Sequence, residues 1–170
     1  MSKSTRIPFV ALIIALFSCN HSQPEKELLP EPTIELFSDV LEELKLSETT
    51  QLQGAVVTPL KHNETEFKLG LQYFQSKNII YMSINEYLWL DMSKNTASTA
   101  FTLTQLAILN HRVTGGKFQL NPTNGAITVG YEHYVANGVD RENLKIAIEK
   151  LISIAKINYE TIKLSLGQVD

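Results

Sequence analysis

Three stretches of the chain after residue 32 carry apolar residues at helical spacing. The first, from Thr33 to Leu46, predicts an amphipathic helix, because its apolar residues recur every three or four positions. A second helix is predicted from about Thr96 to Val113, and a third from its N-cap Asp140 to about Leu164. The residues expected to face the core are Ile34, Phe37, Leu41 and Leu44, then Phe101, Leu103, Leu106, Leu109 and Val113, then Leu144, Ala147, Ile148, Leu151, Ile154 and Ala155.

Between these helices, apolar and polar residues alternate in the pattern of half-buried strands. Five strands are predicted: Leu52 to Pro59, an edge strand stopped by its proline, then Phe67 to Phe74, Ile79 to about Trp89, Lys117 to Leu120, and Ala126 to Val135. Short polar stretches around Asn78 and from Asn121 to Gly125 predict hairpin connections. The element order αβββαββα predicts an α+β domain around an antiparallel sheet.

The first 18 residues have the pattern of a cleaved export signal. Lys3 and Arg6 precede an apolar run from Ile7 to Phe17. At about 1.5 Å per residue, a helix of this length is too short for a bilayer core about 30 Å thick. A charged start, a short apolar middle and a small residue before the cut are typical of secretory signals. The alternative, a buried amphipathic helix, is disfavoured because the run is apolar on every face.

The residues that end this run carry a family resemblance. Leu16, Phe17, Ser18 and Cys19 resemble the lipobox of bacterial lipoproteins, although Phe17 is bulkier than the residue usual at its position. The resemblance implies that Cys19 becomes the first mature residue and carries acyl chains. Two or more such chains anchor a protein stably. We therefore expect a membrane-anchored protein that faces the periplasm or the outer surface of a bacterium.

The mature chain is expected to have two parts. Residues 19–32 are rich in proline and charge and predict a tether that spans at most about 40 Å. Residues 33–170 have a suitable length for a single domain. Loss of Lys3 and Arg6 leaves 13 basic against 18 acidic residues, a formal charge of −5, which argues against nucleic acid as a partner. Because the one cysteine is used for lipid, the fold depends on its core rather than on disulfides.

No group of residues has the spacing of a catalytic or metal site. Glu132 and His133 are neighbours on a strand and point to opposite faces. Glu86 and Asp91 lack a nucleophile or oxyanion donor, which favours ordinary solvated charges. No phosphate-binding loop or nucleophile elbow is present, and no spacing of three or four joins the four histidines, His21, His62, His111 and His133. The sequence therefore predicts no enzyme, no metal and no cofactor.

The run from Tyr87 to Leu90 is a candidate partner surface. Consecutive apolar residues on a strand cannot all face one side of a sheet, so either both faces are covered or one is exposed. Exposed apolar patches often mark interaction sites. One hypothesis is that a second copy or a client segment packs on Tyr87 and Trp89. The alternative is that the second and third predicted helices cover this stretch.

The second half of the chain carries another resemblance. A helix ending at Leu109 and Asn110 is followed by a strand from Gly116 to Leu120, and a helix start at Gly138-Val139-Asp140 leads into a long last helix with Tyr159. This arrangement resembles the YbjN-like domain, which is similar in fold to class I chaperones of type III secretion. Members of the first group are often labelled sensory-transduction regulators. The resemblance to the chaperones implies dimers that bind an extended segment of a partner.

Together these observations predict a lipid-anchored, non-enzymatic cell-envelope protein of YbjN-like fold that binds another protein, as a chaperone or an adaptor. A sensory or regulatory module in envelope signalling is the first alternative. An enzyme with an unrecognised site is the second. The expected partners are the membrane, reached through the lipid, and a protein client or a second copy, with no nucleic acid or small-molecule ligand.

The lipid anchor can be tested directly. Cys19→Ala should abolish metabolic palmitate labelling and release the protein from membranes, because the only acylated side chain is removed. Labelling and fractionation of the native host measure both effects. A variant that still labels and still pellets with membranes would place the anchor elsewhere in the chain.

Overall fold

The structure is a computed structural model that describes residues 29–46, 48–93 and 97–167. The predicted signal peptide, Cys19 and most of the predicted tether lie outside the described residues. None of the helices in the described ranges combines the length and the apolar composition that a membrane span needs. The anchor and the membrane location therefore stay predictions from the sequence.

The described ranges form a single sheet flanked by helices. The sheet is antiparallel throughout and has the strand order β1-β2-β3-β4-β6-β5. In chain order the elements are α1 (Ile34–Glu43), β1 (Thr50–Leu52), β2 (Ala55–His62), β3 (Thr65–Phe74), a 3-10 turn (Gln75–Lys77), β4 (Ile79–Trp89), α2 (Ala97–Arg112), β5 (Lys117–Leu120), β6 (Ala126–Tyr134) and α3 (Arg141–Ser165). The predicted α+β class and the order of its helices and strands are confirmed, with the short β1 added.

The added strand comes from a hairpin that the sequence pattern did not predict. Gln53 and Gly54 have φ of 47° and 79°, the left-handed values that a two-residue hairpin turn requires. The predicted edge strand is thus divided between β1 and β2. Pro59 does not stop β2, which continues to His62. The nitrogen of Pro59 faces the edge of β2 that β1 borders, and β1 pairs only as far as Val57. In the described ranges, no strand there needs the N–H that the proline lacks.

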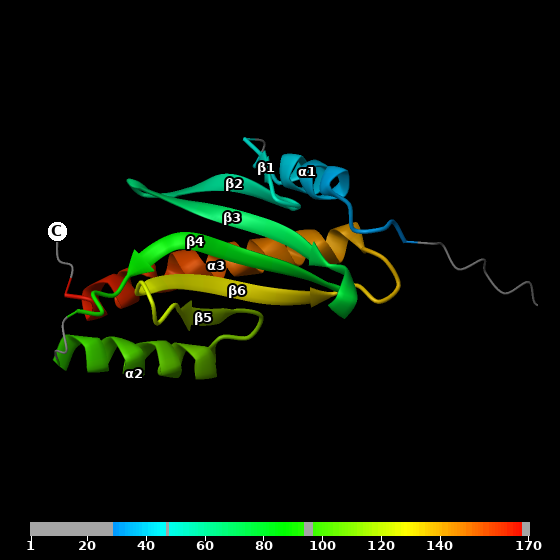
Figure 1. Ribbon diagram of the computed structural model, residues 1–170. Helices are drawn as coiled ribbons and strands as arrows, with labels where there is room; N and C mark the ends of the chain where they lie inside the picture. Colours follow the sequence, from blue (N-terminus) through cyan, green and yellow to red (C-terminus); the bar gives the residue numbers. More distant parts are fainter. Residues whose placement is uncertain (1–28, 47, 94–96, 168–170) are drawn as a thin grey trace, which may run out of the picture.

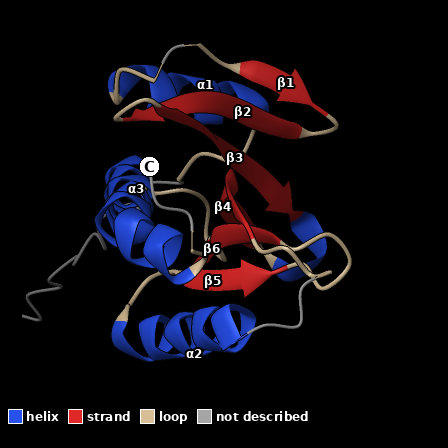
Figure 2. Ribbon diagram, turned by 90° about the vertical axis from the view of Figure 1, so that its left-hand side faces the viewer, coloured by secondary structure: helices blue, strands red, loops and turns tan. Residues whose placement is uncertain are grey.

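The helices leave one face of the sheet open. Figure 1 shows α3 lying behind β3, β4 and β6, with α2 along the β5 edge. Figure 2 shows the same layers from the side, with α3 on one side of the strands and no α-helix covering the other, where only the short 3-10 turn at the end of β3 is seen. The core therefore lies between the sheet and the layer that α1 and α3 form, which is why strand residues alternate between buried and solvent-facing positions.

Both helices of this layer begin at a capping side chain and bury one stripe. The Asp140 carboxylate accepts a hydrogen bond from Asn143 N at 3.0 Å, and the Thr33 hydroxyl accepts one from Leu36 N at 3.2 Å. Such caps satisfy backbone donors that the first helical turn leaves unpaired. The buried residues of α3 are Leu144, Ala147, Ile148, Leu151, Ala155, Tyr159, Ile162 and Ser165.

An irregularity in β4 determines the position of Tyr87. The pairing of β4 with β6 shifts between Ile84 and Leu88, and Glu86 has a φ of 57°. The Tyr87 side chain is 1% exposed, and its hydroxyl donates a hydrogen bond to the Ala155 carbonyl of α3 at 2.7 Å. Burial raises the pKa of Tyr87 far above its usual value. The expectation that Tyr87 forms part of a partner surface is therefore corrected, because this side chain links α3 to the sheet.

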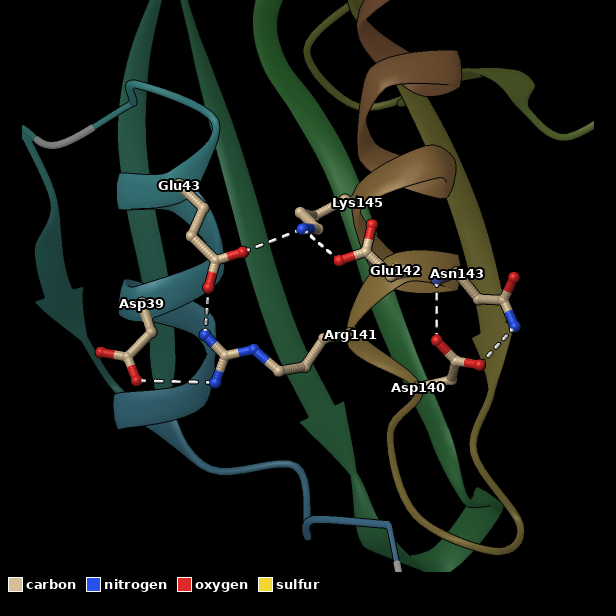
Figure 3. Close-up of polar contacts among 7 residues, drawn as sticks. All are labelled: Asp39, Glu43, Asp140, Arg141, Glu142, Asn143 and Lys145. Atoms are coloured by element: carbon tan, nitrogen blue, oxygen red, sulfur yellow. Dashed lines mark hydrogen bonds and ion pairs between the residues drawn. The ribbon is translucent and has the colours of Figure 1, made fainter.

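A set of exposed ion pairs joins α1 to the first turns of α3 (Figure 3). Glu43 accepts from Arg141 and from Lys145, the latter at 2.9 Å, and Lys145 also pairs with Glu142. Arg141 approaches Asp39 at 3.8 Å. Lys145 and Arg141 lower the pKa of Glu43, while Glu142 and Glu43 raise the pKa of Lys145. Exposed pairs add little stability, so these contacts chiefly orient α1 on α3.

The hydrogen bond between Tyr87 and α3 can be tested by removing one atom. Tyr87→Phe keeps the buried ring but loses the donor, so the free energy of unfolding should fall by about 1 kcal/mol. Urea unfolding measures the change. Tyr134→Phe is the matched control, because the Tyr134 side chain is 74% exposed and its loss of a hydroxyl should leave stability unchanged. Equal losses in both variants would contradict this role of Tyr87.

Candidate functional site

Two of the carboxylates considered for catalysis, Glu86 and Asp91, have ordinary partners. Glu86 pairs with Lys68 at 2.8 Å, and the Asp91 carboxylate accepts from the Ser93 hydroxyl at 2.6 Å. On β6, Glu132 is exposed and His133 is half-buried, on opposite faces as the alternation predicts. Burial lowers the pKa of His133. In the part of the chain that the structure describes, no group of three His, Cys, Asp or Glu residues is placed to hold a metal ion.

Trp89 is the exposed member of the predicted aromatic run. Its side chain is 48% exposed, whereas Leu88 and Leu90 on either side are 4% and 5% exposed. Met92, which follows in the segment that leads toward α2, is 43% exposed. The structure therefore separates the two residues of the predicted surface: Tyr87 lies in the core, and Trp89 lies at the surface close in sequence to α2.

The α2 helix presents an uncharged surface to solvent. Phe101 and Leu103 are 53% and 44% exposed. The sequence has no charged residue between Ala97 and His111, a stretch that covers almost the whole of α2. Large exposed apolar side chains without interspersed charge are characteristic of interaction surfaces. We call this surface the α2 outer face, formed by Ala100, Phe101, Leu103, Thr104, Ala107 and Ile108.

The orientation of this surface follows from how α2 is fixed to the domain. Leu106 and Leu109 are buried, and the buried Thr102 hydroxyl donates to the Ser165 carbonyl of α3 at 2.7 Å. At the other end of α2, the Asn110 side chain bonds to the backbone of Phe118 in β5. With these contacts made on one side, successive residues 100° apart place Phe101 and Leu103 on the two exposed flanks of the helix, to either side of Thr102.

A second row of exposed apolar residues lies on α3 but is interrupted by charge. Ile146, Ile157 and Leu164 are 59%, 74% and 62% exposed. Spacings of 11 and 7 residues place them along one line of the helix. Lys150 and Glu160 lie on the same side between them and are exposed. The α2 outer face is therefore the better candidate for a protein-binding surface.

Sequence reasoning assigned Phe101 and Leu103 to the core, and the structure corrects both. Their spacing fitted a buried stripe, but Leu106, Leu109 and Thr102 fill the side that contacts the rest of the domain. A helix that mixes apolar and uncharged polar residues on every side gives no periodic signal to distinguish its inner face. The absence of charge along α2 was the one available signal of an exposed binding surface.

Comparison with solved structures gives the fold of the domain. YbjN from E. coli, described as a proposed transcription regulator, matches with a TM-score of 0.54 at 14% identity over 76% of this chain and 93% of that chain. The ExsC-ExsE complex matches with a TM-score of 0.53 at 13% identity over 75% and 91%. An uncharacterized protein from Methanothermobacter thermautotrophicus matches with 0.52 at 17% identity over 78% and 98%. No protein-family model and no curated protein matches the sequence.

These similarities support the resemblance seen in the sequence at the level of fold. The domain has the architecture of YbjN and of the chaperone-like ExsC, and each match covers about three quarters of this chain. At 13% and 14% identity, these matches do not identify the functional residues of this chain. The candidate surface is therefore argued from this chain alone.

The orientation of α2 has a measurable consequence. Phe101→Ser should change the free energy of unfolding by no more than about 0.5 kcal/mol, because the side chain is exposed. Leu106→Ala should cost about 2 to 5 kcal/mol, because it empties a buried position. Denaturant unfolding compares the two. An equally large loss for Phe101→Ser would show that this residue packs in the core.

Proposed function

We propose that this protein is a lipid-anchored, non-enzymatic domain of the bacterial cell envelope that binds another protein through the α2 outer face. The observation that carries the proposal is the uncharged exposed helix, in which Phe101 and Leu103 are held toward solvent by the fold. Burying such residues against a partner gains about 25 cal/mol for each Å² of apolar surface removed from water. No charge on the helix has to be desolvated before Arg112.

The fold supports binding rather than chemistry. A protein of similar architecture, ExsC, was solved in a complex with ExsE, so this fold is compatible with a protein partner. Glu86 and Asp91 have ordinary partners, and in the described residues no group of three His, Cys, Asp or Glu residues is placed to hold a metal ion. Partner binding needs only a stable scaffold and an exposed surface, and the domain has both.

The predicted anchor is compatible with this surface. The Pro30 carbonyl accepts a hydrogen bond from Val139 N at 2.8 Å, so the segment that precedes α1 meets the domain where β6 leads into α3. Figure 1 shows this entry at the end of the domain far from the start of α2. A tether attached there leaves the α2 outer face accessible. The lipid on Cys19 would then hold the domain near the membrane without covering the surface.

The proposal is tested by crosslinking in the native host. A photoreactive amino acid in place of Phe101 should trap a defined partner, whereas the same group in place of the exposed, charged Glu149 of α3 should trap little. Phe101→Ser should reduce co-purification of the trapped partner severalfold without loss of fold. Mass spectrometry of the product distinguishes a second copy of this chain from another protein.

Two results would contradict the proposal. Equal crosslinking from both positions would mean that the α2 outer face has no preference for a partner. Undiminished association in Phe101→Ser would place binding elsewhere. Cys19→Ala tests the anchor separately, because it changes location and leaves the surface intact.

A further inference from the structure

Most strand edges of the sheet are short or blocked. On β5, the Asn110 amide donates to the Phe118 carbonyl at 2.9 Å, and its oxygen accepts from Phe118 N at 2.7 Å. One side chain thus occupies both outward backbone groups of that residue. At the opposite edge, β1 has three residues, and Pro59 removes a donor from the part of β2 beyond it. Such features prevent further strands from pairing with a sheet.

One stretch of strand edge is different. The short β5 pairs with β6 only from Ile127 to Gly130, although β6 continues to Tyr134 (Figure 1). Before β5, Gly115 has a φ of 89°, and this turn separates the chain from β6. Among the described residues, no backbone pairs with Tyr131 to Tyr134 on the side away from β4. We call this stretch the uncovered β6 edge.

The hydrogen-bond pattern shows which backbone groups this edge presents. Val135 N donates to the Asn78 carbonyl at 3.0 Å, so odd-numbered residues of this part of β6 direct their backbone groups toward β4. Alternate residues direct theirs to the other side. Glu132 and Tyr134 therefore present two N–H and two C=O groups outward. An antiparallel segment can pair with all four, continuing the line of β5.

Hollows flank the uncovered β6 edge on both faces of the sheet. On the open face, a hollow of about 390 Å³ is lined by Tyr81, Gly130 and Glu132, among others. On the helix side, a hollow of about 580 Å³ is lined by His133, Ile146 and Lys150, among others. Tyr131 and Tyr134 line both. Side chains of an added strand alternate between the two faces, so each hollow would receive every second residue.

A glycine makes room for the hollow on the open face. Tyr81 reaches across Gly130 to donate to the Gln119 side chain at 2.9 Å. A Cβ on Gly130 would lie 2.5 Å from the Tyr81 hydroxyl, so any larger residue would displace this bridge. The base of the hollow is therefore backbone and a fixed aromatic side chain, beside the exposed carboxylate of Glu132.

We propose that the uncovered β6 edge binds an extended segment of a partner protein by strand addition. The segment would place a basic side chain beside Glu132 on the open face and an apolar one in the hollow beside Ile146. Lys117 of β5 lies opposite Gly130, two residues before Glu132, and donates to the Asn110 carbonyl at 3.1 Å. In the described ranges no ion pair joins it to Glu132. This inference rests on the proposed protein-binding function and adds a second contact to it.

A second copy of the chain fits this edge less well than a linear segment. Four strand residues span about 13 Å. A stable dimer buries roughly 800 Å² on each partner, which a contact of this length does not supply. In the two-fold register centred on Glu132, the carboxylates of the two copies would lie directly opposite each other, where like charges destabilise pairing.

The free protein provides the first test. In the full chain, purified in detergent, the amides of Glu132 and Tyr134 should exchange with deuterium rapidly, while those of Tyr131 and His133 should be protected by β4. Protection of Glu132 and Tyr134 that rises with protein concentration would show that a second copy holds the edge. Protection independent of concentration would show that the chain itself covers it. Either result would overturn the proposal.

The second test uses random heptapeptides displayed on phage and selected against the full chain. For a selected peptide, Glu132→Pro should weaken binding about tenfold, because it removes one outward N–H that β4 does not use. Glu132→Ala keeps the N–H and removes only the carboxylate, so it should weaken binding of a peptide that is basic at the facing position by no more than about threefold. Bound peptide should also protect the amides of Glu132 and Tyr134.

N-methylation of the peptide keeps the test decisive if Glu132→Pro fails to fold. Every second residue of the bound peptide directs its N–H toward β6, so N-methylation of these residues should abolish binding. N-methylation of the residues between them, whose N–H groups point away from β6, should leave binding unchanged. Loss at no position, or at every position, would overturn strand addition, as would failure to select any peptide that protects Glu132. Peptides that lose binding to Phe101→Ser but not to Glu132→Pro would overturn this inference and leave the proposed function intact.

Discussion

The attachment of α3 to one face of the sheet is the contact on which the rest of the domain depends. Its buried stripe covers β4 and β6 and reaches Phe67 of β3 through Tyr159, and the Tyr87 hydroxyl bonds to the Ala155 carbonyl in the middle of the helix. Because α1 and α2 both pack against α3, their positions follow from this contact. One long helix on one face of the sheet leaves the other face open, and it places α2 at the β5 edge with its outer side in solvent.

The two proposed binding surfaces arise from different physical properties of the same scaffold. The α2 outer face offers apolar side chains and no charge, so it would act by removing hydrophobic surface from water. The uncovered β6 edge offers backbone donors and acceptors, so it would act by directional hydrogen bonds that tolerate many sequences. Asn110 lies between the two, because it belongs to the last turn of α2 and blocks the edge of β5.

Much of the fold could be predicted from the sequence, because helix and strand periods differ and the turn residues are distinctive. The Asp140 cap, the last helix and the strands on either side of Gly125 were predicted within a residue or two. The orientation of α2 was not, since its apolar and uncharged polar residues are mixed on every side and the pattern marks no inner face. The hairpin at Gln53 was missed because a single positive-φ glutamine leaves little trace in the sequence.

The surfaces were harder to predict than the elements, because they depend on how elements meet. Trp89 and Tyr87 are two residues apart and looked alike, yet a shift in strand pairing buries one and exposes the other. The uncovered β6 edge depends on where β5 begins, which the turn at Gly115 decides. Strand register determines which backbone groups are paired, and no single-residue pattern encodes it.

The contact between the entering chain and the β6–α3 loop has a mechanical consequence. A Cβ on Gly138 would lie 2.6 Å from the Leu29 carbonyl oxygen, so only glycine allows the two backbones to approach this closely. The Pro30 carbonyl then bonds to Val139 beside it. A force that pulls on the residues before Leu29 would act on these two backbone contacts before it acted on α1. The force would thus enter the domain at the start of α3, its longest helix, where the β6–α3 loop connects that helix to the sheet.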